Sequence, residues 1–431
     1  MNPSTYRRYL LAVLLLILAS NYVDRLAMGL VLQSIKFDLH LSDTQLGVLT
    51  GIAFATFYSV MGIPIARWAD RGNRRTIIAI TTALWSAAVM LSAAARNFSQ
   101  LLCIRIGAAV GEAGCIPTAH SLIANYFDRD ERPRAVSVYM MGGSFSVVVG
   151  YFLAGWLNEI YGWRITFVLI AMPGVVLSVI AAITLREPRR ETHTTVVSSE
   201  PSIPSLREVS RTLWSSRTFR HVLLGFAVSQ FFGFGILQWQ PAFFVRSYGL
   251  TTGVLGTCFT LIAGLGSLLG NYAGGHWASR YAASRESRQL KAIALAYGIF
   301  ALSSAFTYLS PNAYLAFTWL AVGMIGGATL SGPLLAVIQT LVPDQMRATS
   351  MALIYFSANL IGMGLGPFVA GALSDALSPV LGPESLRYAL LILSPGYFWA
   401  AWHAWKASQT VAEDIRLVQL NCEAFRRGLG L

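Results

Sequence analysis

Twelve long apolar stretches divide this chain of 431 residues, and each is long enough to cross a bilayer as a helix. A helix rises about 1.5 Å per residue, so roughly 20 apolar residues span the hydrocarbon core. Apolar residues make up 55% of the chain and charged residues 12%, about half the charged share of a soluble domain. The sequence therefore predicts an all-α membrane protein with 12 transmembrane helices. The predicted spans are 9–33, 44–66, 75–95, 98–126, 134–158, 163–186, 219–246, 252–279, 289–309, 312–342, 346–375 and 386–408.

Basic residues collect in alternate loops between these spans. The loop after the second span carries four arginines within residues 67–75, whereas the loop after the ninth span has none. Lys and Arg mark cytoplasmic loops. We therefore predict that both termini and the loops after even-numbered spans (the inner loops) are cytoplasmic, and that the loops after odd-numbered spans (the outer loops) are not. The net charge of +12 then reflects topology, and we expect a monomer in the cell (inner) membrane with no nucleic-acid partner.

The chain turns polar between its sixth and seventh spans. Residues 187–218 are rich in Arg, Ser, Thr and Pro, which predicts a cytoplasmic linker. This linker separates an N-terminal six-helix bundle, residues 1–186, from a C-terminal six-helix bundle with a cytoplasmic tail, residues 219–431.

The two halves resemble each other in sequence. The segment Gly150-Tyr-Phe-Leu-Ala-Gly-Trp-Leu-Asn-Glu159 matches Gly366-Pro-Phe-Val-Ala-Gly-Ala-Leu-Ser-Asp375. Two pseudo-symmetric halves of six spans, each built from inverted triplets, describe the major facilitator fold, with a binding site at mid-membrane between the halves. Residues 66–75, ARWADRGNRR, are similar to the signature G-x-L-A-D-R-x-G-R-R of that superfamily, although Ala and Asn replace its two glycines.

Asp24 and Arg25 lie side by side well inside the first span. A charge at that depth costs roughly 3 kcal/mol on an insertion scale, so it faces a partner or a water-filled path. Asn21 shares this helix face and can hydrogen-bond either charge from one turn away. One reading is a static salt bridge that ties the first span to a neighbour. The other is a titratable site, in which moving the arginine away lets the acid take a proton.

Arg105 and Glu112 repeat this pattern in the fourth span, seven residues apart on one face, or about 10.5 Å along the axis. The first and fourth spans begin the two inverted triplets, so we expect their charged faces to meet in one cavity. The predicted pairing joins Arg25 to Glu112, and Arg105 to Asp24 or Glu112. Asp24 and Glu112 are then the predicted proton-coupling residues, with a static ion network as the alternative. Pro117 is predicted to bend the span one turn further on.

Asp70, Arg71 and Arg74 lie at the inner end of the second span and are predicted to form a gate. Asp70 would rest on the positive start of the eleventh span, just after Pro343 and Asp344. Ordinary anchoring of a cytoplasmic loop is the alternative, and for Arg74 it is the stronger one.

The second half contrasts with the first because its spans hold no charge at depth. Its seventh span is rich in aromatic and amide side chains, which line a cavity only if this span occupies the same central position as the first. Aromatic residues that merely face lipid or the core are the alternative. The predicted substrate-binding residues are Arg25, Arg105, Asn21, Gln230, Phe234, Trp239 and Asn359.

Two motifs sharpen the resemblance. Asn21-Tyr-Val-Asp-Arg25, taken with Arg105 and Gly111-Glu112-Ala113, is similar to the Spinster family of transporters, which move sphingolipids and lysophospholipids. The resemblance implies that Asp24 and Glu112 are proton sites and that Arg25 is a switch or a headgroup contact. The patterns N-Y-x-D-R and E-A also occur in the organic anion:cation symporters, which carry sugar acids.

These observations predict a proton-coupled secondary transporter of a lysophospholipid or sphingoid-type amphiphile, working by alternating access. Charges in one half and an aromatic, uncharged other half suit an amphiphile, with a symporter of small organic anions such as sugar acids as the alternative. The cysteines show no metal-ligand spacing, so we expect no metal and no cofactor. No nucleophile or acid–base cluster lies at the membrane interface, so we expect no enzyme activity. A channel is disfavoured because two pseudo-symmetric halves suit a rocking motion.

Overall fold

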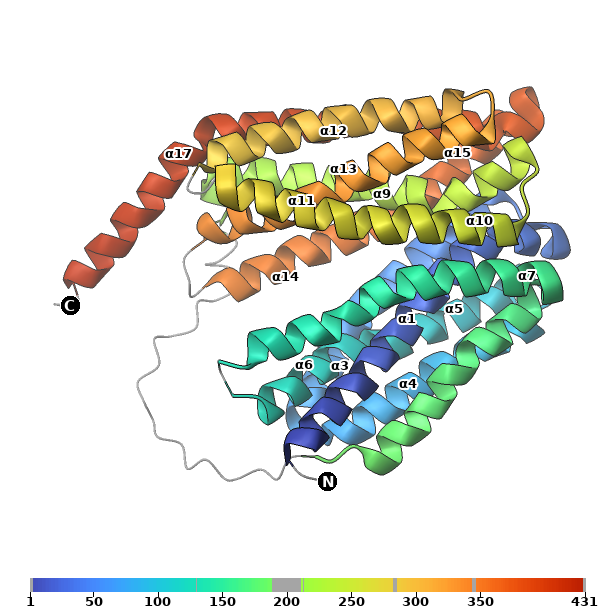
Figure 1. The fold of residues 1–431 in the computed structure, drawn as a ribbon, viewed down its shortest axis with the longest axis horizontal. Coiled ribbons are helices and arrows are strands. Elements are labelled where there is room, and N and C mark those ends of the chain that lie inside the picture. Colours follow the sequence, from blue (N-terminus) through green and yellow to red (C-terminus); the bar gives the residue numbers. More distant parts are fainter. Residues whose placement is uncertain are drawn as a thin grey trace. The chain divides into compact units, whose positions relative to one another are not determined.

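A computed structural model of the chain describes residues 3–128, 130–187, 211, 213–281, 285–342 and 346–428. Within these residues every regular element is a helix, and no strand occurs. Helices cover all twelve of the predicted spans (Figure 1). The predicted all-α membrane fold is therefore confirmed. Most of the predicted linker, 187–218, lies outside the described residues.

The first half contains spans one to six. Its helices are α1 (Pro3–Leu39), α2 (Asp43–Gly47), α3 (Ala53–Arg71), α4 (Arg74–Leu91), α5 (Phe98–Ala113), α6 (Cys115–Tyr126) and α7 (Arg132–Thr184). A π-helical turn, Val48–Ile52, joins α2 to α3 within the second span. Helix α7 holds the fifth and sixth spans, which meet at Gly162, where a φ of 77° reverses the chain; glycine adopts this conformation without steric cost. Figure 1 shows α1 between the two arms of α7.

The fourth span is interrupted where the sequence predicts a bend. Helix α5 ends at Ala113 and α6 begins at Cys115, with Gly114 between them. Pro117 lies in the first turn of α6, where its missing backbone N–H leaves no helical hydrogen bond unmade. The interruption lies two residues after Glu112.

The second half contains spans seven to twelve. Its described helices are α9 (Arg217–Tyr248), α10 (Thr252–Phe259), α11 (Gly266–Tyr281), α12 (Glu286–Leu309), α13 (Ala313–Thr340), α14 (Arg347–Ser357), α15 (Gly366–Leu381), α16 (Ser385–Leu393) and α17 (Gly396–Gly428). The π-helical segments Thr260–Leu265 and Ala358–Leu365 join α10 to α11 and α14 to α15. Spans eight and eleven are thus each built from two α-helical pieces.

Side-chain caps begin helices at the outer loops. Ser42 Oγ accepts from Gln45 N, and Gln45 Oε1 accepts from Ser42 N, which makes a capping box at the start of α2. Asn97 caps α5 and Asn312 caps α13 in the same way, through their Oδ1 atoms. Each such cap stabilises a helix by about 1 kcal/mol. Short outer loops therefore suffice to turn the chain.

By packing, the described chain forms two compact units. Unit 1 comprises Met1–His193, Leu237–Gly264 and Pro367–Arg387, and unit 2 comprises Thr194–Ile236, Leu265–Gly366 and Tyr388–Leu431. Unit 1 therefore includes the first half together with the outer ends of spans seven, eight and eleven. The boundaries 1–186, 187–218 and 219–431 follow the sequence repeat and stay a prediction.

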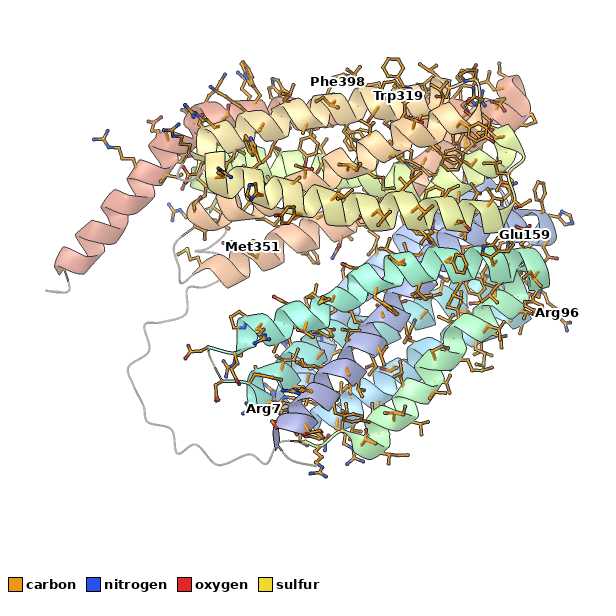
Figure 2. The ribbon with its side chains drawn as sticks, in the orientation of Figure 1. Arg7, Arg96, Glu159, Trp319, Met351 and Phe398 are labelled. Carbon is orange, nitrogen blue, oxygen red and sulfur yellow. The ribbon has the colours of Figure 1, made fainter. Side chains whose placement is uncertain are left out.

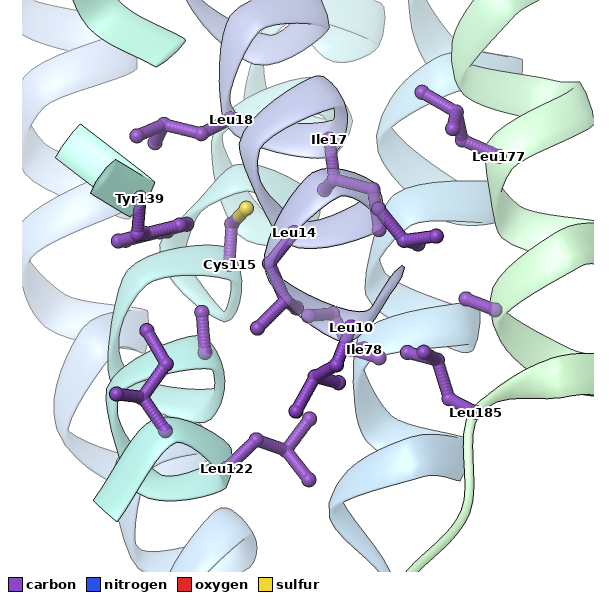
Figure 3. Packing of buried hydrophobic residues seen from close by; sticks show 14 of the residues in the cluster. Leu10, Leu14, Ile17, Leu18, Ile78, Cys115, Leu122, Tyr139, Leu177 and Leu185 are labelled. Carbon is purple, nitrogen blue, oxygen red and sulfur yellow. The ribbon is translucent and has the colours of Figure 1, made fainter. Parts of the chain in front are cut away.

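An apolar cluster in unit 1 holds α1 in place at its inner end (Figure 3). Leu10, Leu14, Ile17 and Leu18 of α1 are fully buried at helical spacing. They pack against α4, α6 and both arms of α7. In a membrane such contacts act through close van der Waals packing rather than through exclusion of water. The cluster fixes the rotation of α1, and hence the direction in which its polar residues point.

Candidate functional site

The predicted charged face of α1 is buried inside unit 1. Asn21 is 1% exposed and Asp24 is fully buried. The side chain of Arg25 keeps 19% of its surface exposed. Buried polar side chains at this depth have to be satisfied by partners from other spans.

Those partners come from α5. Arg25 Nε donates to Glu112 Oε2 at 2.6 Å, and Arg105 Nη1 donates to Asp24 Oδ2 at 3.1 Å. Arg105 and Glu112 are 3% and 1% exposed. The two ion pairs run crosswise between α1 and α5, which is the pairing that the sequence predicts. Because their four charges cancel, the cluster is neutral when both acids are ionised.

Each carboxylate in this cluster uses only one of its oxygens. Asp24 Oδ1 and Glu112 Oε1 are buried and have no hydrogen-bond partner among the described residues, and the same holds for Asn21 Nδ2 and Arg105 Nε. Asn21 thus does not donate the hydrogen bond to a neighbouring charge that the sequence suggests. A buried polar atom without a partner costs about 1–3 kcal/mol. An acid with one oxygen in an ion pair and one without a partner can accept a proton or a second ligand.

Aromatic rings surround the two arginines. The Arg25 guanidinium carbon lies 5.2, 4.8 and 4.7 Å from the ring centres of Tyr22, Phe54 and Tyr58. The Arg105 guanidinium carbon lies 5.1 Å from the same Phe54 ring. Such contacts stabilise a desolvated cation by about 2 kcal/mol. Sequence reasoning missed these rings, although Phe54 and Tyr58 stand one helical turn apart in the second span.

The predicted residues of the second half divide between the two units. Gln230 and Phe234 of α9 and Asn359 of the π-helical segment are half-buried in unit 2. Gln230 lines a cavity of about 200 Å³ there, together with Phe226, Phe300 and Tyr397. No charged side chain lines this cavity in the described part of the chain.

Trp239 differs from these residues because it belongs to unit 1 and is fully buried. Its indole Nε1 donates to Pro367 O of α15 at 2.9 Å. The structure therefore places Trp239 in the packing between α9 and α15. Its predicted contact with substrate stays a prediction.

The predicted gate is described only in part. The side chain of Asp70 lies outside the described residues, and so do Pro343 and Asp344, which precede its predicted partner, the start of the eleventh span. The predicted contact stays a prediction. Arg71 is exposed. Arg74 binds within the first half, where its Nη1 donates to Glu187 Oε1 at 2.8 Å and its Nε donates to Ser121 Oγ at 2.6 Å.

A second ion network, which sequence reasoning did not predict, lies at the outer end of unit 1. Asp43 of α2 is 1% exposed. Arg246 of α9 donates from Nη1 and Nη2 to its two carboxylate oxygens at 2.7 and 2.6 Å. Lys36 of α1 and Ser374 of α15 donate to the same carboxylate. This network joins the first half of the sequence to the second.

Two further acids cap helix starts in the opposite half. Asp375 of α15 accepts from the backbone N–H groups of Asp43 and Thr44, at 3.0 and 2.7 Å, where α2 begins. Glu159 of α7 accepts from the backbone N–H of Gly253 at 2.6 Å, where α10 begins. We call Asp43, Arg246, Asp375, Glu159 and Gly253 the outer clasp; Figure 2 labels Glu159 at its end of α7.

The outer clasp repeats the internal symmetry of the sequence. Glu159 and Asp375 end the two matching ten-residue segments, and α2 and α10 open the corresponding second and eighth spans. Glycines of the repeat allow the close approach. A Cβ on Gly155 would lie 2.4 Å from Thr252 O, and one on Gly371 would lie 2.3 Å from Asp43 O. The sequence repeat shows an acid at both positions, Glu159 and Asp375, but it does not show which helix each acid caps.

These features are those of a multi-pass membrane transporter, because a buried ion network lies in mid-span of the first half and acids at one end join the two halves of the repeat. The profile of the Major Facilitator Superfamily matches residues 14–367. The chain belongs to that superfamily and is not an enzyme.

Individual relatives cover most of the chain. An MFS-type efflux pump of Mycolicibacterium smegmatis (strain ATCC 700084 / mc(2)155) is 33% identical over 386 residues, which are 88% of this chain and 87% of the relative. A probable L-galactonate transporter of Escherichia coli (strain K12) is 27% identical over 88% of this chain and 85% of its own. The structure of a bacterial homolog to the human lysosomal transporter Spinster, inward-facing and unoccupied, superposes with a TM-score of 0.84 at 28% identity, and covers 95% of this chain and 98% of that one. The predicted superfamily and the Spinster resemblance are confirmed.

Proposed function

We propose that this protein is a proton-coupled secondary transporter of an amphiphilic lipid, of the lysophospholipid or sphingoid type, which works by alternating access. The observation that carries the proposal is the crosswise pairing of Arg25 with Glu112 and of Arg105 with Asp24. The cluster is buried and neutral, and each of its carboxylates has one oxygen without a partner among the described residues. Such a carboxylate can bind a proton, which raises the charge of the cluster from zero to +1.

The coupling step follows from that charge. Protonation of Glu112 removes the partner of Arg25 and leaves the cluster with a net charge of +1. Arg25 keeps its aromatic contacts, which hold the guanidinium in place for an anionic group of the substrate. Loss of the proton restores the ion pair and expels that group. Proton and substrate therefore move in the same cycle.

Two observations support an amphiphilic substrate. The charged cluster suits a headgroup, whereas the cavity beside Gln230 is aromatic and lined by no charge among the described residues. A Spinster homolog is similar in sequence and structure along nearly the whole chain.

Sugar acids are the second candidate substrate. The probable L-galactonate transporter of E. coli is similar over 88% of this chain. The unpartnered Asn21 Nδ2 and Asp24 Oδ1 are groups that sugar hydroxyls can satisfy. This candidate shares the coupling step and differs in what fills the cavity.

The distribution of arginines supports a place in the cell (inner) membrane with both termini cytoplasmic. On that orientation the outer clasp closes the non-cytoplasmic end.

Reconstituted liposomes test the proposal. We expect saturable uptake of a lysophospholipid that increases with an imposed proton gradient, and proton movement that requires the substrate. Glu112→Gln and Asp24→Asn are expected to abolish proton movement, while Glu413→Gln, which changes an exposed acid at the chain's far end, leaves both fluxes unchanged. Uptake of sugar acids without uptake or binding of amphiphiles would refute the lipid substrate. Undiminished proton movement in Glu112→Gln would refute the coupling.

A further inference from the structure

A groove on unit 1 lies between the first turns of α1 and the start of α7, and it encloses about 690 Å³. Its mouth is charged and its depth is apolar. Arg7, Arg8, Arg134, Asp130 and Glu131 line the mouth. Figure 2 labels Arg7 at this end of unit 1, away from Glu159 of the outer clasp. A volume of this size is typical of sites that hold a ligand.

Some of the charged side chains at the mouth pair with one another. Arg7 Nη1 donates to Glu131 Oε2 at 2.9 Å, and its guanidinium carbon lies 5.6 Å from the Phe127 ring centre. In the described part of the chain, Arg8, Arg134 and Asp130 form no ion pair or side-chain hydrogen bond. The mouth thus offers two guanidinium groups and one carboxylate to a ligand that carries both signs of charge.

The depth of the groove is hydrocarbon. Leu11, Ala12 and Leu15 follow Arg8 along one face of α1, and Val138 faces them from α7. Leu15 lies about 10 Å deeper than Arg8 along the helix axis, within the roughly 15 Å of one leaflet's hydrocarbon. The groove therefore matches a headgroup at the interface and the first part of one acyl chain.

We propose that this groove binds a phospholipid with an ammonium headgroup, of the phosphatidylethanolamine type, from the cytoplasmic leaflet. Arg8 and Arg134 bind its phosphate, Asp130 binds its primary ammonium, and the acyl chain lies along Leu11 and Leu15. The choice of leaflet rests on the orientation proposed above. The site is separate from the transport site because Arg8 precedes Asp24 by about 24 Å along α1.

The headgroup distinguishes this lipid from others with the same chains. Phosphatidylglycerol brings a phosphate but no cation for Asp130. Phosphatidylcholine brings a trimethylated nitrogen that cannot donate a hydrogen bond to a carboxylate. The groove is therefore expected to retain phosphatidylethanolamine more strongly than either.

Native mass spectrometry of the full chain tests this, with the three lipids offered at equal concentration and equal chain length. We expect phosphatidylethanolamine adducts to dominate. Arg8→Gln combined with Arg134→Gln lowers their retention by about tenfold or more, the effect of losing charged hydrogen bonds. Asp130→Asn removes the preference over phosphatidylglycerol, and Ala12→Trp fills the groove and lowers retention of all three lipids.

Matched controls keep the result specific. Arg288→Gln removes an exposed charge outside the groove, and Leu16→Trp places a tryptophan on a neighbouring face of α1. Neither is expected to change retention. Glu112→Gln is expected to retain the lipid while it loses proton movement, so the two proposals fail separately. Equal retention of the three lipids, or adducts indifferent to all of the groove substitutions, overturns the proposal. If phosphatidylglycerol is retained as strongly as phosphatidylethanolamine, and Asp130→Asn does not change that ratio, then Asp130 does not bind the ammonium.

Discussion

Replacing Arg246 by glutamine is expected to open the outer clasp. Arg246 donates twice to Asp43 and once to Gln33, at 2.6–2.7 Å, and the Arg246 and Asp43 side chains are 10% and 2% exposed. Removing one member of a buried ion pair costs about 3–5 kcal/mol. Lys36 and Ser374 still contact Asp43, so we take the lower value of about 3 kcal/mol. At about 1.4 kcal/mol per factor of ten, the population in which the outer clasp is formed falls roughly 100-fold relative to the population in which it is broken.

Distances between spin labels measure this shift. Labels on Arg96→Cys and Tyr314→Cys, in a background with the native cysteines replaced, place one probe in the outer loop before α5 and the other in the first turn of α13. Arg246→Gln is expected to lengthen the distance distribution in nanodiscs. Arg164→Gln is the matched control, because Arg164 pairs with Asp38 inside the first half at the same end. If both variants leave the distribution unchanged, or change it equally, the clasp does not hold the halves together.

Three further changes have expected outcomes. Phe54→Leu removes the ring that both site arginines share, so it is expected to weaken proton-driven uptake in liposomes about tenfold, whereas Phe57→Leu, at a partly exposed position, has little effect. Glu159→Gln weakens the cap on α10 by about 1 kcal/mol, and the same spin labels are expected to report a smaller opening than Arg246→Gln causes. Gly155→Val forces a side chain into the Thr252 backbone, while Gly143 has open space around it, so thermal unfolding in detergent is expected earlier for Gly155→Val than for Gly143→Val.

The fold was predictable because the bilayer leaves few solutions. Spanning segments have to satisfy their own backbone hydrogen bonds, so long apolar runs become helices. The fourth span shows how far this extends: residues 98–126 were predicted, and α5 and α6 cover Phe98–Ala113 and Cys115–Tyr126. The break in this span was predictable too, because a proline in the interior of a helix removes a backbone hydrogen bond and bends or breaks the helix before it.

The site was predictable where charge alone decides the pairing. Two acids and two arginines buried in two spans have few ways to neutralise one another, and the crosswise pairs follow. The aromatic rings around Arg25 and the enclosure of Trp239 did not follow, because an aromatic residue in a span suits lipid, core and cavity equally well. Side-chain packing between spans selects among those places, and one sequence does not show that packing.

The outer clasp explains why the matching segments end in acids. In each half an acid at the end of the fifth or eleventh span caps a helix that belongs to the other half. A carboxylate on a helix N-terminus is stabilised by the positive end of the helix dipole as well as by its hydrogen bonds. The two caps are related by the internal repeat. If one carboxylate moves away from the helix start that it caps, the other carboxylate is no longer aligned with its own helix start. Opening at this end is therefore expected to be cooperative, so that Glu159→Gln and Asp375→Asn together shift the label distances by less than the sum of their separate effects.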